Sequence, residues 1–229
     1  MSAYITKTEI EQYLGVTIDA TLQTFMDTII AMTQEYIEAF CGGGIIEKRV
    51  FNDADTTVTR YYDGRGMTKL KIDDLRSVTS LSADDVALVA NTDYYLYPLN
   101  AVADGKPYEW IELIQPETRL RTNTNSRIEV TSPYIFENKQ RNITIVGKWG
   151  YSLTPPKSVK LAALRLCGAV IKENIGDNDL KNITQESLGD YSVSYQDIKD
   201  AAISQKVGEI LYPYVRKSNN KKTGVFLAK

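Results

Sequence analysis

Hydrophobic positions follow different periods along the chain, and the changes of period divide it into parts. Thr6 and Glu9 form a capping box at the start of a short helix that ends near Leu14. From about residue 19, apolar side chains recur at helical spacing until the run Gly42–Gly44. Glycine readily reverses the chain after a helix, so this run is expected to end the second one. Residues 1–44 are therefore predicted to form an N-terminal helix pair.

Between residues 45 and 150, short stretches of apolar and polar alternation replace the helical period. This pattern is typical of strands. Asp63-Gly64 is expected to form a hairpin turn that joins the strands on either side of it. The predicted strands are Lys48–Phe51, Thr57–Tyr62, Thr68–Ile72, Ser77–Leu81, Thr92–Pro98, Glu109–Ile114, Ser126–Thr131 and Asn142–Lys148.

The stretch Arg141–Lys172 takes the chain from a strand back to helix. Pro156 suits the first turn of a helix, where its missing N–H is not needed. The helix that follows is apolar on nearly every side, which predicts packing on more than one face. Another helix is expected from Ile198 to about Tyr212, where Pro213 bends or ends it.

These elements predict an α+β fold with a helical bundle and an inserted β-rich subdomain. The bundle consists of the N-terminal helix pair, residues 1–44, and two C-terminal helices, residues 151–216. The β-rich subdomain covers residues 45–150, and residues 217–229 form a basic tail.

Composition narrows the class of protein. The chain has 229 residues and a net charge of −2, so any basic patch must be local. No apolar run reaches membrane-spanning length and the first residues lack a signal-peptide core, which indicates a protein made and kept in a cytosol. Cys41 and Cys167 are interpreted as buried thiols, with a disulfide or a reactive nucleophile as alternatives.

The sequence offers little that supports catalysis. It has no histidine, and no Walker loop, GxGxxG, HExxH or CxxC motif is present. Its paired aspartates fall in turn-like segments with too few ligands at regular spacing for a Ca²⁺ loop. We therefore predict no catalytic residues, no cofactor and no metal site. An enzyme remains an alternative class for which no residue set can be named.

Two basic features are candidate interaction sites. The tail could be a solvated end, a DNA-contacting segment, or a docking arm that charge steers and an apolar patch anchors in a partner's groove. Its candidate residues are Arg216, Lys217, Lys221, Lys222, Val225, Phe226, Leu227 and Lys229. On the helix after Pro156, Lys157, Lys160, Arg165 and Lys172 fall within an arc of about 140°. This stripe is either a surface for a polyanion or an ordinary solvated edge.

The order of these segments resembles the head–tail connector (adaptor) family of tailed bacteriophages. ITKTEIEQYLGV and ATLQTFMDTIIAMTQEYIEAFCG are similar to the family's opening helix pair, and LKIDDLRSVTSLSADD and TDYYLYPLN to the β-rich middle of its longer members. ITIVGKWGYSLTPPKSVKLAALRLCGAVIKE resembles the strand, the break with "GY" and proline, and the long helix that follow. ESLGDYSVSY and EILYPYVRK are similar to the last segments before the tail. The resemblance spans nearly the whole chain. The glycine run Gly42–Gly44 departs from it, because relatives often carry a polar or basic residue there.

The resemblance implies a structural protein of the virion neck that is not an enzyme. Such a protein forms a homo-oligomeric ring, usually of twelve copies, beneath the portal, extends the DNA channel, and gives the tail or a stopper protein its attachment surface. The helices would form the ring body, the C-terminal tail would reach the portal protein, and the basic stripe would line the channel for passing double-stranded DNA. Such a protein is made in the host cytoplasm and has no membrane partner. The alternative from a different class is a non-viral protein-binding module that uses the β-rich subdomain.

Overall fold

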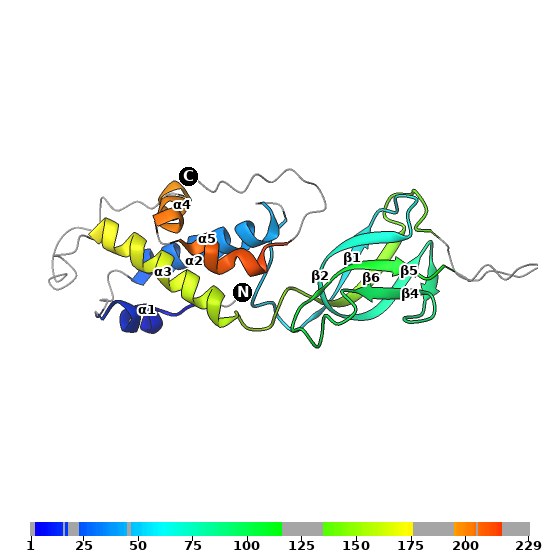
Figure 1. Cartoon of the computed structure of the whole chain (residues 1–229), viewed down its shortest axis with the longest axis horizontal. Helices are drawn as coiled ribbons and strands as arrows, with labels where there is room; N and C mark the ends of the chain where they lie inside the picture. The colour runs from blue at the N-terminus through cyan, green and yellow to red at the C-terminus, as the bar shows by residue number, and fades with distance from the viewer. Residues whose placement is uncertain are drawn as a thin grey trace, which may run out of the picture. The chain divides into compact units, whose positions relative to one another are not determined.

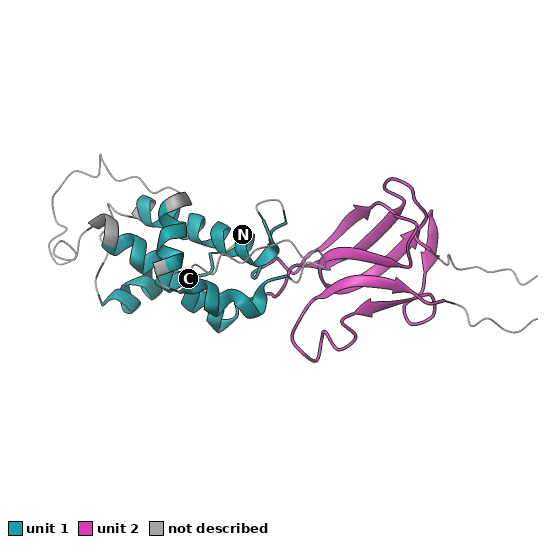
Figure 2. Cartoon of the chain, turned by 45° about the horizontal axis from the view of Figure 1, so that its top comes forward, with its two compact units in different colours: residues 1–52, 154–229 teal, residues 53–153 magenta. Residues whose placement is uncertain are grey.

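A computed structural model describes residues 3–15, 17, 23–44, 47–115, 135–175, 195–204 and 206–216. The chain forms two compact units (Figure 2). The helical unit comprises residues 1–52 and 154–229, and the β unit comprises residues 53–153. The fold is mixed α+β, as expected. The expected inner boundaries at 45 and 150 differ from those of the structure, since residues 47–52 lie with the helices.

The first N-terminal helix has the predicted ends, and the second ends where the sequence predicts. The first, α1 (Lys7–Leu14), starts with Thr6 as its N-cap and has both bonds of the capping box with Glu9. The second, α2 (Gln23–Gly42), ends in the glycine run, where the N–H groups of Gly43 and Gly44 both donate to the carbonyl of Ala39. The expected start of the second helix, near residue 19, lies outside the described residues.

The helix α3 (Lys157–Ile175) is the centre of the helical unit. It contacts α1, α2, α4 (Tyr195–Ser204) and α5 (Val207–Leu211) (Figure 1). Val159, Leu166 and Val170 are fully buried on one face of α3, and Gly168, on the opposite face, packs against α1. The helix therefore packs on more than one face, as predicted. Gly168 allows α1 to come close, because a Cβ there would lie 3.0 Å from the Tyr13 ring.

The last predicted helix is two helices. The chain breaks between α4 and α5, where Lys206 takes a left-handed backbone with φ of 53°. Pro213 then lies in a single 3₁₀ turn, Tyr212–Tyr214, which follows α5 directly. The prediction of one continuous helix from Ile198 to about Tyr212 was wrong. Apolar residues keep their helical spacing through the break, and a lysine such as Lys206 gives no sign in the sequence of a left-handed backbone.

The β unit is a six-stranded antiparallel sheet. Its main order is β1-β6-β2-β5-β4 (Figure 1), and β3 pairs with β2. The strands are β1 (Thr57–Tyr62), β2 (Lys69–Ala83), β3 (Val86–Leu88), β4 (Tyr94–Tyr97), β5 (Tyr108–Leu113) and β6 (Ile143–Trp149). One buried apolar cluster, which includes Leu75, Ile111, Ile145 and Trp149, fills its interior.

Several strand predictions were wrong. Thr68–Ile72 and Ser77–Leu81 belong to one long strand, β2, whose register shifts accommodate the residues between them. The expected hairpin at Asp63-Gly64 does not form, because β1 pairs with β6. The predicted strand Lys48–Phe51 is not a strand, and β3 was missed. The predicted strand Ser126–Thr131 lies outside the described residues.

Aromatic contacts explain why residues 47–52 belong to the helical unit. The buried ring of Phe51 packs edge-on against Tyr4 and Tyr214, with ring centres 6.1 and 5.8 Å apart. Its backbone N–H donates to the Tyr4 hydroxyl at 3.0 Å. Arg49 N–H donates to the Glu38 carbonyl, and its guanidinium donates to the Tyr214 carbonyl. This segment therefore ties the N-terminus, α2 and the C-terminal turn together.

Candidate functional site

The basic stripe of α3 begins beside the buried face, at Lys160, and continues to the opposite side of the helix. Its arc also contains buried Gly168, against which α1 packs. Lys157 and Lys172 are exposed, whereas Lys160 and Arg165 are partly buried. Lys160 Nζ donates to Glu9 Oε1 of α1 at 2.8 Å, so its charge is already paired. Exposed Leu161 interrupts the stripe. That the stripe faces DNA in a channel remains a prediction.

Only one member of the predicted docking tail lies among the described residues. Arg216 is 7% exposed, and its backbone N–H donates to the carbonyl of Cys41 at the end of α2. Its place is thus in the body of the helical unit and not in an exposed tail. The other members lie outside the described residues: Lys217, Lys221, Lys222, Val225, Phe226, Leu227 and Lys229.

Both cysteines are buried free thiols in the helical unit. The Cys167 thiol donates to Thr33 Oγ1 at 3.4 Å, and burial raises its pKa to about 12. A thiol with this pKa is protonated at neutral pH and is a poor nucleophile. Among the described residues, no three histidine, cysteine or carboxylate side chains are grouped to hold a metal ion. None of the described helices combines the length and hydropathy needed to cross a membrane.

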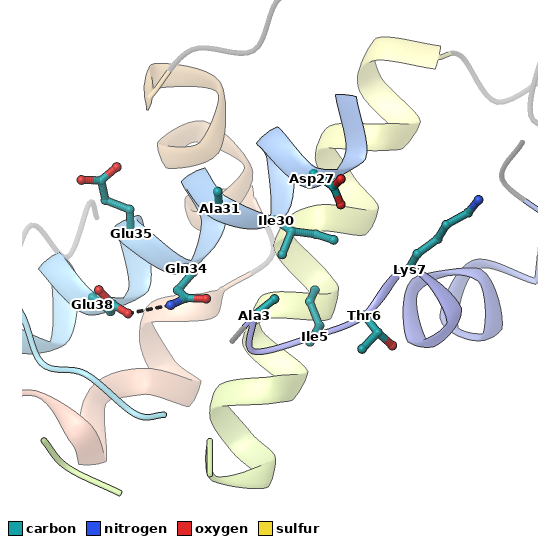
Figure 3. A pocket seen from close by; sticks show the side chains of 10 residues that line it. All are labelled: Ala3, Ile5, Thr6, Lys7, Asp27, Ile30, Ala31, Gln34, Glu35 and Glu38. Carbon is teal, nitrogen blue, oxygen red and sulfur yellow. Dashed lines mark hydrogen bonds between the residues drawn. The ribbon is translucent and has the colours of Figure 1, made fainter. Parts of the chain in front are cut away.

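A groove runs along α2 beside the N-terminal segment. It has a volume of about 460 Å³ and is called the α2 groove here. Side chains at helical spacing on α2 form one wall, and residues 3–7 form the other (Figure 3). The lining residues are Ala3, Ile5, Thr6, Lys7, Asp27, Ile30, Ala31, Gln34, Glu35 and Glu38. Its floor is apolar at Ile5 and Ile30. The charged side chains of the lining are three carboxylates and the ammonium group of Lys7.

Glu38 is a buried carboxylate in this groove. Its side chain is 5% exposed and accepts from the Tyr4 hydroxyl at 2.8 Å and from the Gln34 amide at 3.0 Å. Both bonds go to Oε1 and both donors are uncharged. Within the described residues, no cation neutralises this carboxylate. Burial, followed by the charge of Glu38, raises the pKa of the Tyr4 hydroxyl far above its usual range, so Tyr4 remains a donor.

The other two acids of the groove differ from Glu38. Glu35 is exposed and forms a salt bridge with Lys48 at 2.6 Å. Asp27 is exposed at the opposite end of the groove from Glu38, on the same side as Lys7 (Figure 3), and it has no hydrogen bond or ion pair among the described residues. The groove therefore has a net negative charge that the surrounding described side chains do not balance.

Sequence reasoning missed this groove. The available signal was Glu38 itself, which falls between the apolar positions Ile37 and Ala39 near the end of the amphipathic stripe. A charged residue within a buried face needs a partner. The wall opposite α2 is a non-helical segment from the N-terminus, and periodicity does not predict where such a segment packs.

The β unit has an edge strand, β1, and an ion pair on its surface. β1 is an edge of the sheet, and Val58 and Tyr61 on it are about half exposed. Arg60 lies 4.4 Å above the Trp149 ring and donates to Asp73 Oδ2 at 2.6 Å. The Arg60 charge is thus paired at the surface of the unit. Apart from Arg60, all side chains of the edge strand β1 are uncharged.

No protein-family model and no curated protein matches the chain. Among solved structures, the chain is similar to one described as "Neck of empty GTA particle computed with C6 symmetry". The match has 14% sequence identity and a TM-score of 0.44, and it covers 95% of this chain and 93% of that chain. At this identity and TM-score, the likeness assigns no function.

Proposed function

We propose that the chain is a structural subunit of the neck of a tailed bacteriophage, a head–tail adaptor that forms a ring beneath the portal. The observation that carries the proposal is the order of segments. The strand β6, the turn at Gly150 with φ of 91°, the proline pair and the long helix α3 follow one another as the sequence resemblance implies. The sheet is also inserted between α2 and α3, as the resemblance implies.

A ring subunit needs two different side surfaces that meet between neighbouring copies. The helical unit supplies several short helices around α3, and the β unit supplies an edge strand and exposed aromatic residues. We assign the helical unit to the ring body. The β unit would contact neighbours, the tail or a stopper protein.

The proposed channel surface consists of the exposed residues Lys157 and Lys172 and the partly buried Arg165 of the α3 stripe. A few dispersed cations suit a channel through which DNA slides, because each phosphate contact adds counterion-linked affinity and many contacts would hold the DNA. Since Lys160 is paired with Glu9, the stripe presents fewer free charges than its sequence indicates. The copy number of twelve and the location in the virion neck are part of the proposal.

Electron microscopy and mass spectrometry of purified virions test the role. We expect the chain in the particles, and density between portal and tail that fits the helical unit and the β unit as separate bodies. Particles that contain portal and tail proteins but not this chain would refute the proposal. If the chain is instead a protein-binding module outside the virion, it will be absent from such particles.

Portal docking by the tail has its own test. Deletion of Ser218–Lys229 is expected to leave the helical content unchanged and to abolish binding to portal-bearing particles. A matched control keeps residues 218–229 in scrambled order, which preserves charge but separates the apolar patch Val225–Leu227. Normal binding of the deletion variant would refute the docking arm. It would not affect the assignment to the neck, which the microscopy and mass spectrometry of virions test separately.

A further inference from the structure

The α2 groove is an acidic site without an occupant among the described residues. Its lining includes Asp27, Glu35 and Glu38 against Lys7 alone. The cation Lys48 already pairs with Glu35. Glu38 is the decisive residue, because a carboxylate at 5% exposure with only neutral donors lacks the charge partner that buried acids usually have. The chemistry of the groove thus fits a segment with basic side chains.

We propose that the α2 groove binds the basic C-terminal segment, residues 217–229, of the same chain. This segment carries Lys217, Lys221, Lys222 and Lys229 and no acidic side chain. Its apolar residues Val225, Phe226 and Leu227 follow the lysines closely. The lysines can approach the carboxylates, and the apolar residues add little because Ile5 and Ile30 are already 1% and 7% exposed. The inference does not depend on portal docking.

The place where the described chain ends favours this occupant. Arg216 is hydrogen-bonded to the carbonyl of Cys41, which lies three residues after Glu38 on α2. Along the helix axis, Cys41 is about 4.5 Å from Glu38 and about 16 Å from Ile30. Ten extended residues from Arg216 to Phe226 span up to roughly 33 Å, so the segment reaches the whole groove.

Tethering favours the same chain over a second copy. A segment attached close to its site has an effective concentration on the order of millimolar, far above the concentration of free protein in a dilute sample. The contact is largely electrostatic, since Ile5 and Ile30 have little exposed surface left to cover. It should therefore weaken strongly when salt shortens the screening distance.

Paramagnetic relaxation in the full chain tests the proposal. A nitroxide is attached at Ala228→Cys; Cys41 and Cys167 are fully buried and do not compete for the label. We expect broadening of backbone amide signals on the groove side of α2, between Asp27 and Glu38. The broadening should disappear near 1 M salt, where the Debye length is about 3 Å.

Charge variants give the matched comparison. Glu38→Gln keeps an oxygen that can accept from Tyr4 and removes the charge; Asp27→Asn removes an exposed charge without disturbing the fold. Each is expected to raise the population of released segment by about twofold to fivefold. Glu112→Gln, in the β unit, removes one charge elsewhere and should change nothing. If Glu38→Gln does not fold, the effect of Asp27→Asn on the released population tests the electrostatic contact by itself.

Three results would overturn the proposal. Absence of broadening on α2 would show that the segment does not occupy the groove. Broadening that appears only between isotope-labelled and spin-labelled copies mixed together would assign the groove to a second copy. Broadening that both charge variants leave unchanged would remove the electrostatic basis of the contact.

Discussion

Replacement of Tyr4 by phenylalanine tests how the helical unit is held together. The Tyr4 side chain is 1% exposed, and its hydroxyl donates to Glu38 Oε1 at 2.8 Å and accepts from Phe51 N–H at 3.0 Å. Phenylalanine keeps the ring and its contact with Phe51, so no cavity forms. The change removes the donor to a buried carboxylate and the acceptor of a buried N–H.

The expected cost is about 2–3 kcal/mol in the free energy of unfolding. A hydrogen bond to a charged group contributes about 1.5–3 kcal/mol, and removal of the acceptor from a buried N–H costs about 1–3 kcal/mol. The two contributions share one hydroxyl, so they do not add fully. With a typical urea dependence of about 1–3 kcal/mol per molar, the midpoint should fall by roughly 0.7–3 M.

The chain provides separate probes for its two units. Both tryptophans, Trp110 and Trp149, lie in the β unit, whereas far-ultraviolet circular dichroism follows mainly the helices. Tyr4→Phe should shift the dichroism transition and leave the fluorescence transition in place. Tyr13→Phe, which removes a hydroxyl from a side chain that is 46% exposed, is the control and should shift neither by more than about 0.5 kcal/mol. An unchanged dichroism midpoint in Tyr4→Phe would refute the role of the hydroxyl, and transitions that move together would refute independent units.

Three further predictions follow from local geometry. Gly147→Ala should destabilise the β unit by about 1–3 kcal/mol in the fluorescence transition alone, because the new Cβ would lie 2.5 Å from the Ser77 carbonyl oxygen; an unchanged transition would contradict the close packing. The hydrogen bond from Lys160 is the largest influence that lowers the pKa of Glu9 below 4.5, so its contribution is present above that pH and is lost as pH falls through the lowered pKa. Glu9→Gln should therefore cost about 0.5 kcal/mol at neutral pH, given its exposure, and nothing in strong acid; a cost independent of pH would contradict this. The Cys167 thiol should resist alkylation in the folded protein and react on unfolding, which mass spectrometry measures, and labelling of the native protein would contradict its burial.

Local signals in the sequence predicted the helical part well. The capping box at Thr6 and Glu9, the glycine run after α2 and Pro156 before α3 each fix a helix end through backbone chemistry that operates within a few residues. The packing of α3 on several sides also follows from its composition, because an all-round apolar helix has no stable solvent face.

Strand pairing was less predictable because it depends on distant partners. Asp63-Gly64 has the composition of a hairpin turn, but the Asp63 carboxylate instead accepts from the backbone N–H of Arg141 at 2.7 Å. Gly64 N–H donates to the side-chain oxygen of Asn142 and to the carbonyl of Lys139. These bonds join segments nearly eighty residues apart and direct β1 to β6. Turn composition carries no information on that partner.

The candidate sites show the same limit. Arg216 belongs to a basic run that is typical of a tail, but its backbone bond to Cys41 holds it in the helical unit. Glu38 becomes a groove residue only because residues 3–7, about thirty positions earlier in the chain, pack beside α2. The basic stripe was predictable as an angular pattern. The pairing of Lys160 with Glu9 was not, because it requires α1 to lie against α3.

The two proposals together make a prediction that neither makes alone. If the basic segment both occupies the α2 groove and docks to a portal, the groove competes with the portal for the same residues. The apparent portal affinity is then reduced by the fraction of segments that are released. Glu38→Gln, which weakens the groove, should increase portal binding, whereas deletion of Ser218–Lys229 should abolish it. Portal binding is measured for Glu38→Gln, for the deletion variant and for the control Glu112→Gln. Equal losses of portal binding in Glu38→Gln and in the deletion variant would exclude competition between groove and portal.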